Sequence, residues 1–158
     1  MTIQRALCVF VIVTLTTVGG CSTVKKYLPF ASNRVVLEEM LITRTEGANR
    51  NKFIQIDIAA IYDSSVNDRL VPAKADAWFS ERASFTAMNT KQIRIQSLQP
   101  VPLSVIKKVE LPKKLSKARR VLVFVAYYQQ KKYFVFDISR IKHVNLVLDE
   151  KPSLETIR

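Results

Sequence analysis

The sequence predicts a mainly β domain: a two-sheet β-sandwich of about seven or eight strands with one helical insertion, placed after an N-terminal signal and a short tether. Two observations predict this fold. The apolar residues beyond Val35 come in short β-branched runs, and polar or Pro-containing breaks separate one run from the next. A half-open barrel is the competing arrangement, because short strands joined by short loops build either architecture.

The start of the chain has the three zones of an export signal. A polar start with one cation precedes an apolar run at residues 6–18, and two glycines stand directly before Cys21. The run has about thirteen residues, and at about 1.5 Å per residue it is too short to span a hydrocarbon core of roughly 30 Å. We therefore expect residues 1–20 to be removed as a signal peptide. A retained apolar helix with a chance cysteine is the alternative.

The residues at the cut resemble the bacterial lipobox, in which a branched apolar residue and two small residues precede a cysteine; here they are Val18, Gly19, Gly20 and Cys21. A thiol can form a thioether to a diacylglyceryl group, and the α-amine freed by cleavage can take a further acyl chain. The resemblance implies lipidation at Cys21, acyl chains that hold the protein on a membrane, and a tether at 21–33. Ser22 follows the cysteine, which implies the outer membrane, because aspartate there favours the inner membrane.

The chain is strongly basic, with 25 Lys+Arg, 13 Asp+Glu and a formal net charge of +12. A basic domain can bind nucleic acid, an anionic membrane surface or an acidic protein. Behind an export signal we expect no nucleic acid, which leaves anionic lipid headgroups or an acidic partner. Cations that only keep a membrane-proximal domain soluble are the alternative. Cys8 lies in the signal and Cys21 would be acylated, so no disulfide is expected.

The expected domain covers residues 34–149, and its elements follow from the pattern in order. Strands are expected at 34–43, 52–62, 91–98, 104–111, 119–128, 133–138 and 143–148, one helix at 72–88, and an irregular tail at 150–158. In the second strand Ile54, Ile56 and Ile58 alternate with polar residues, which predicts one buried face and one exposed face. The run 119–128 is apolar on both faces, which is typical of a central strand.

The helix at 72–88 has helix-favouring residues and a proline suited to a first helical position. Trp78 and Phe79 are expected to bury it against the sheet. The polar segment 62–68 is interpreted as a turn, because Asp, Ser and Asn satisfy local backbone groups there.

The residue types argue against an enzyme. His143 is the one histidine, it lies on an alternating strand, and no nucleophile motif accompanies it. One histidine and scattered carboxylates cannot supply a usual zinc site. We therefore expect no catalytic residue, no metal and no cofactor. The function is then expected to depend on a surface that binds a partner.

Two segments are candidates for partner binding. The loop 44–51 is polar, contains Gly47 and separates two apolar strands, and we expect Arg44, Glu46, Asn49 and Arg50 to contact a partner. The basic segment Lys113 to Arg120 can meet phosphate headgroups or an acidic domain. An ordinary solvated loop and a charged edge that discourages aggregation are the respective alternatives.

The order of these features resembles the outer-membrane lipoprotein of the type VI secretion system, the TssJ family: a lipobox, a tether, two opening strands, a helical insertion after the strand ending Ile58-Ala59-Ala60-Ile61-Tyr62, and further strands. The resemblance implies a transthyretin-like β-sandwich that anchors a trans-envelope machine by binding the periplasmic domain of an inner-membrane core protein. It also implies partner contacts in the loop 44–51. Two alternatives stay open: a pilotin or pore-associated lipoprotein of another secretion or conjugation system, and an envelope lipoprotein that binds anionic lipid.

Overall fold

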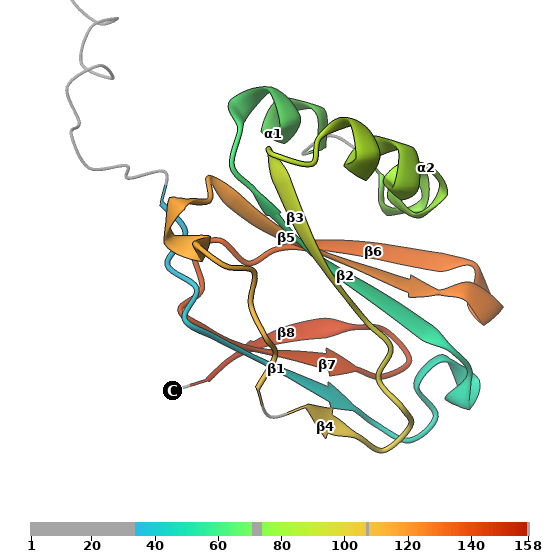
Figure 1. Cartoon of the computed structure of the whole chain (residues 1–158). Helices are drawn as coiled ribbons and strands as arrows, with labels where there is room; N and C mark the ends of the chain where they lie inside the picture. Colours follow the sequence, from blue (N-terminus) through green and yellow to red (C-terminus); the bar gives the residue numbers. More distant parts are fainter. Residues whose placement is uncertain (1–33, 71–73, 107, 158) are drawn as a thin grey trace, which may run out of the picture. The chain divides into compact units, whose positions relative to one another are not determined.

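The computed structural model of this chain describes residues 34–70, 74–106 and 108–157. Two four-stranded sheets form the domain (Figure 1): sheet A has the strand order β4-β1-β7-β8, and sheet B has the order β3-β2-β5-β6. The predicted two-sheet β-sandwich is therefore confirmed. The expected signal peptide 1–20, the expected lipidation site Cys21 and the tether 21–33 lie outside the described residues.

Eight strands and two α-helices follow one another along the described part of the chain. They are β1 (Glu39–Arg44), β2 (Ile54–Ile61), α1 (Ser64–Leu70), α2 (Ala75–Met88), β3 (Ile93–Leu98), β4 (Val105–Ile106), β5 (Arg120–Tyr127), β6 (Lys132–Asp137), β7 (His143–Leu148) and β8 (Ser153–Thr156). Single 3-10 turns lie in the loops at η2 (Ala48–Asn51), η3 (Leu115–Lys117) and η4 (Tyr128–Gln130). Neither α-helix of the described segments is long and apolar enough to span a membrane.

The two sheets differ in strand direction. In sheet A, β1 pairs in parallel with β7, from Glu39 opposite His143 to Arg44 opposite Leu148, while β4 and β8 pair antiparallel at the two edges. Sheet B is antiparallel throughout, with β2 and β5 at its centre. A parallel pair needs a long crossover connection, and here the whole of sheet B and both helices lie in the chain between β1 and β7.

The main core lies between the two sheets and is built by alternate residues of the central strands. Fully buried apolar side chains meet there: Met40 and Ile42 of β1, Val144, Leu146 and Leu148 of β7, Ile54, Ile56 and Ile58 of β2, and Val121, Val123 and Val125 of β5. Successive side chains of a strand point to opposite faces, so these residues form a continuous apolar layer.

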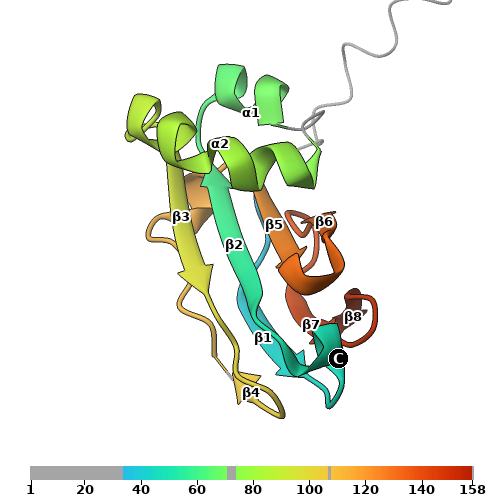
Figure 2. The ribbon, with the colours of Figure 1, turned by 90° about the vertical axis from the view of Figure 1, so that its right-hand side faces the viewer.

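The prediction that one face of β2 is exposed is wrong, because all eight residues of the strand are buried. The helices α1 and α2 cover the outer face of sheet B (Figure 2), where they enclose a second apolar cluster. The ring of Trp78 stacks on that of Phe124, with centroids 4.5 Å apart and planes at 11°. The expectation that Trp78 buries the helix against the sheet is confirmed.

The helical insertion contains one helix more than predicted. Residues 64–70 form α1 instead of a turn, and its Val66 and Leu70, one helical turn apart, are buried against sheet B. The local role expected of Asp63 holds, because its carboxylate accepts hydrogen bonds from the Ser65 amide at 2.8 Å and the Ser65 hydroxyl at 2.6 Å. The second helix begins at Ala75, and the expected start at Pro72 lies outside the described residues.

Three strand boundaries also differ from the prediction. The tail expected to be irregular at 150–158 contains β8, whose Leu154 packs on the main core while its neighbours face solvent. The first strand begins at Glu39 and not at Arg34, and the strand predicted at 104–111 is only the two-residue β4. The edge strands β4 and β8 have two and four residues, which is too few for a clear alternating pattern.

Candidate partner-binding surface

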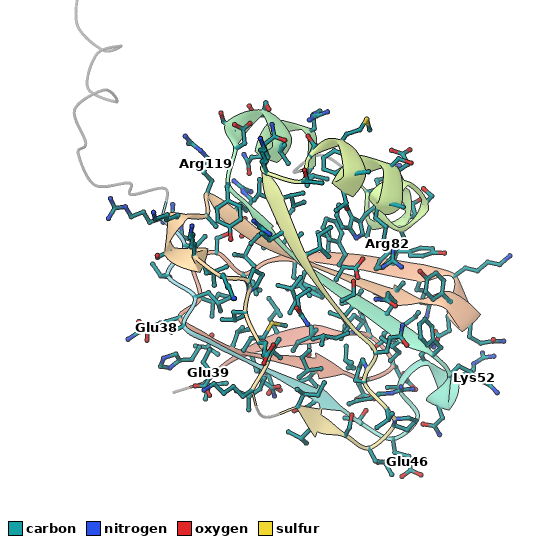
Figure 3. The ribbon with its side chains drawn as sticks, viewed as in Figure 1. Glu38, Glu39, Glu46, Lys52, Arg82 and Arg119 are labelled. Atoms are coloured by element: carbon teal, nitrogen blue, oxygen red, sulfur yellow. The ribbon has the colours of Figure 1, made fainter. Side chains whose placement is uncertain are left out.

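Four loops meet at one end of the sandwich, which we call the loop end. They are the β1–β2 loop (45–53), the β3–β4 loop (99–104), the β5–β6 turn (128–131) and the β7–β8 turn (149–152). Glu46 and Lys52 mark this end in Figure 3, and Glu38 and Arg119 lie at the opposite end. The strand pairing places these loops together, because β1, β3, β5 and β7 all end here.

Arg44, the last residue of β1, fastens two of these loops from inside. Its side chain is buried at 3% exposure, and its guanidinium donates to the carbonyl oxygen of Pro100 at 2.6 Å, of Lys52 at 2.6 Å and of Ala48 at 3.3 Å. Burial lowers the pKa of Arg44, but a guanidinium stays charged in proteins. Its rigid fork suits several acceptors at once, so Arg44 holds the β1–β2 loop to the β3–β4 loop.

The β1–β2 loop contains a left-handed turn. Gly47 has a φ of 81°, and Asn49, Arg50 and Asn51 follow with φ of 50°, 54° and 59°. Non-glycine residues in this region are strained unless their surroundings fix them. The side-chain amide of Asn49 donates to the backbone carbonyl of Phe53 at 2.6 Å, and the side-chain oxygen of Asn51 accepts from the backbone amide of Gly47 at 3.0 Å. These contacts and Arg44 give the loop one defined shape.

Further contacts join the β1–β2 loop to the other two turns. The Thr45 hydroxyl donates to the carboxylate of Asp149 at 2.9 Å, and the Tyr127 hydroxyl donates to the Asp149 carbonyl at 2.8 Å. The Phe53 ring stacks on Tyr128 of the β5–β6 turn, with centroids 5.8 Å apart and planes at 21°. The loop end is thus one connected surface and not four independent loops.

Exposed apolar side chains gather at this end. The described residues contain eight large apolar side chains that are exposed, and five of them lie in these loops or directly beside them: Phe53 at 46%, Val101 at 66%, Leu103 at 70%, Val105 at 53% and Tyr128 at 39%. Single exposed apolar residues are ordinary, but a group of them on one surface is typical of a protein interaction site.

The structure divides the four predicted partner-binding residues into two pairs. Arg44 and Asn49 are buried, at 3% and 0% exposure, and they shape the loop from within. Glu46 and Arg50 are exposed and lie on its outer side. Sequence reasoning missed the aromatic and aliphatic part of the surface, Phe53, Tyr128 and the segment 101–105. Their apolar character gave no signal, because each adjoins a strand and is indistinguishable there from a core residue.

A buried polar network lies beneath α2, and it is the other cluster of polar side chains that could form a binding or catalytic site. Asp57 is fully buried, and its carboxylate accepts from Trp78 Nε1 at 3.0 Å, Arg82 Nη1 at 2.7 Å, Ser97 Oγ at 2.7 Å and Gln55 Nε2 at 3.1 Å. Each carboxylate oxygen is therefore occupied, and the network attaches α2 to sheet B.

The described residues hold no cluster of three His, Cys, Asp or Glu side chains that would suit a metal ion. His143 lies at the opposite end of the sandwich from the loops, with Nε2 3.5 Å from the carboxylate of Glu38. The loop end is therefore the candidate protein-binding surface of the described domain.

These features define a two-sheet β-sandwich with a helical layer on one face and a preorganised apolar surface at one end. Among solved structures the chain is similar to the crystal structure of the type VI secretion system lipoprotein TssJ1 from Pseudomonas aeruginosa, with a TM-score of 0.49 and 9% sequence identity, covering 77% of this chain and 98% of that chain. No protein-family model matches the sequence, and no curated protein matches it.

Proposed function

We propose that this chain is an outer-membrane-anchored periplasmic lipoprotein that serves as a structural component of a trans-envelope secretion machine of the type VI kind. In this proposal, acyl chains on Cys21 hold the protein on the membrane, and the loop end binds the periplasmic domain of an inner-membrane core protein. The lipobox resemblance around Cys21 supports the anchor. The order of strands and helical insertion along the sequence supports the kind of machine.

The observation that carries the binding role is the group of exposed apolar side chains on loops of fixed shape. Aromatic residues are enriched at the centres of protein interfaces, and Phe53 and Tyr128 already stack on each other in the free protein. A surface that is ordered before binding loses less conformational entropy when the partner arrives. Arg44 and Asn49 contribute by keeping the β1–β2 loop in its binding shape.

The exposed charges of the same loop serve a different purpose. Glu46 and Arg50 are exposed in the loop that also carries Phe53, and charged residues are typical of the rim of an interface. Charges at a rim orient the partner and raise the association rate more than they raise affinity. We therefore assign the affinity to the apolar residues and the register of the complex to Glu46 and Arg50.

The test uses the full lipidated chain, purified in detergent and used as bait for a detergent extract of its native envelope. One variant removes the apolar group by Phe53→Ser with Tyr128→Ser. The matched control, Val36→Ser with Met88→Ser, removes two exposed apolar side chains elsewhere, with exposures of 43% and 73%. We expect the parent and the control to capture a large inner-membrane protein and the loop-end variant to lose it.

Other outcomes decide between the remaining hypotheses. Capture of an outer-membrane ring protein would replace the proposal with a pilotin or a pore-associated lipoprotein of another secretion or conjugation system. Equal capture by the loop-end variant and the control would show that the partner binds elsewhere on the domain.

A further inference from the structure

The end of the sandwich opposite the loop end carries a basic platform, which we define as residues 113–120 and 139–142. These twelve residues include seven cations and no acid: Lys113, Lys114, Lys117, Arg119, Arg120, Arg140 and Lys142. Lys113, Lys114, Lys117 and Arg119 are exposed. The platform therefore concentrates positive charge on one small part of the surface.

The platform is built into the fold. Between its lysines, Leu115 and Ala118 are buried in the main core, at 9% and 2% exposure. The Tyr62 hydroxyl donates to the Lys113 carbonyl at 2.8 Å, and the Arg119 amide donates to the Ile61 carbonyl at 2.7 Å. The backbone is thus fixed from the inside, and the lysine side chains are directed outward.

Acidic residues nearby neutralise only part of this charge. Arg120 pairs with Asp137 at 3.0 Å and Lys142 pairs with Glu38 at 3.2 Å. The pKa of Asp63 is lowered mainly by hydrogen bonds from Ser65, and the charge of Arg119 lowers it slightly further. Within the described residues, Lys113, Lys114 and Lys117 take part in none of the ion pairs. Their charge is available to a partner.

A hollow of about 240 Å³ is lined in part by residues of the platform. Three arginines, two serines and an asparagine line it together with Asp68 and Asp137: Arg119, Arg120, Arg140, Ser64, Ser139 and Asn67. Guanidinium and hydroxyl groups are the usual donors to phosphate oxygens. Because the Ser139 hydroxyl already donates to Asp137, the arginines are the groups in this hollow that suit an anionic headgroup.

The described chain also begins at this end. The Val36 amide donates to the Ser139 carbonyl at 2.9 Å, and Arg140 Nη1 donates to the Arg34 carbonyl at 3.0 Å. Arg34 follows Cys21 by 13 residues, and a chain of that length spans at most roughly 45 Å when fully extended. An acylated Cys21 would therefore keep this end of the domain within roughly 45 Å of the membrane surface.

We propose that the basic platform lies on the anionic surface of the membrane that holds Cys21, so that the loop end points away from it. This rests on the proposed lipid anchor. The central strands set the distance between the two ends, because β2 and β5 pair from Ile54 opposite Tyr127 to Ile61 opposite Arg120. Eight residues of strand extend about 25 Å. Contact at the platform thus presents the apolar surface to the periplasm, where an inner-membrane partner can reach it.

The test places one fluorophore at each end of the full, acylated chain in lipid vesicles. Ser116→Cys labels the platform and Gln129→Cys labels the β5–β6 turn, and both positions are exposed. Spin-labelled lipid headgroups quench a fluorophore that lies near them. In vesicles containing phosphatidylglycerol we expect at least about threefold stronger quenching at 116 than at 129, and loss of this difference at about 1 M salt, where the Debye length is about 3 Å.

Two charge variants distinguish an effect of the platform lysines from an effect of the protein's net charge. Changing Lys113, Lys114 and Lys117 to Gln should abolish the difference between the labels. The matched variant changes Lys131, Lys132 and Lys151, which are exposed at or beside the loop end, and should retain it. Both variants lose three charges, so an equal effect would overturn the proposal.

Three further outcomes would also overturn it. The first is equal quenching of the two labels on an acylated chain, and the second is the same quenching difference in vesicles made only of phosphatidylcholine. The third is a platform variant whose quenching is unchanged but which no longer captures the envelope protein in the capture experiment described above. The last result would assign the platform to an acidic protein. Mass spectrometry of the purified chain tests the anchor separately, because absent acyl chains would refute the proposed function before the platform is considered.

Discussion

The indole Nε1 of Trp78 donates a hydrogen bond of 3.0 Å to the carboxylate of Asp57, and this contact connects α2 to the centre of sheet B. Both side chains are buried, at 3% and 0% exposure. Asp57 is a charge inside the fold, and burying a charge is costly unless hydrogen bonds satisfy it. Four donors surround this carboxylate, so each donor that is removed leaves a buried charge less well compensated.

Replacing Trp78 by Phe should lower the free energy of unfolding by about 1.5–3 kcal/mol, because a hydrogen bond to a charged group is lost while most of the stacked ring remains. Urea denaturation measures the loss. A double-mutant cycle with Asp57→Ala should give a coupling energy above about 1 kcal/mol between the two side chains. Additive effects of the two substitutions would show that the contact contributes nothing specific.

Replacing Arg44 by Met should lower the free energy of unfolding by about 2–4 kcal/mol, because three carbonyl oxygens lose a buried donor. Arg44→Lys should recover little of this, since one ammonium group cannot reproduce the guanidinium fork. The control is Arg50→Met in the same loop, where the side chain is exposed and a change within about 0.5 kcal/mol is expected. Equal urea midpoints for the two Met variants would contradict the role of Arg44.

The pKa of Asp63 is lowered from its ordinary value of 3.8, first by the Ser65 hydroxyl and then by the Ser65 amide. A group with a lowered pKa in the folded state stabilises that state above its unfolded pKa, and the contribution is lost as the pH falls through the lowered value. Asp63→Asn should therefore be less stable than the parent at neutral pH, and the difference should shrink below about pH 4. Urea midpoints from pH 2 to 7 measure this, and a difference that is constant with pH would refute it.

The strand β8 should contribute measurably to stability although it is short. Leu154 packs on the main core and Ser153 is exposed, so Leu154→Ala should cost about 1–2 kcal/mol and Ser153→Ala less than about 0.5 kcal/mol. Thermal unfolding compares the two variants. A chain that ends before Ser153 should also aggregate more readily, because β7 then presents an unpaired edge. If Leu154→Ala left the stability unchanged, β8 would not pack on the core.

Much of the sandwich could be predicted because its central strands carry strong patterns. The run at 119–128 is apolar on both faces and is the central strand β5, as predicted. The alternation at 52–62 located β2 correctly. These segments are long enough for the period of two to stand out from neighbouring residues.

The rest depends on partners that lie far away in the sequence. Gln55 and Asp57 have the pattern of a solvent-facing side of a strand, but Trp78 and Arg82 bring donors to Asp57 from 21 and 25 residues further along the chain. Arg44 is polar and stands in a polar segment, and its acceptors are backbone carbonyls, which no residue pattern reveals. In the sequence alone, the buried loop residues that fix the shape of a surface therefore cannot be distinguished from the exposed loop residues that form it.

The parallel pairing of β1 with β7 sets the order in which the chain can fold. The hydroxyl of Thr43 on β1 donates to the side chain of Asn145 on β7, 102 residues later. Pairing over such a separation carries a large loop-closure entropy and is slow. Half of the sandwich therefore cannot assemble until almost the entire polypeptide has emerged. Under the proposed export through a narrow channel, this topology postpones the final fold until translocation is nearly complete.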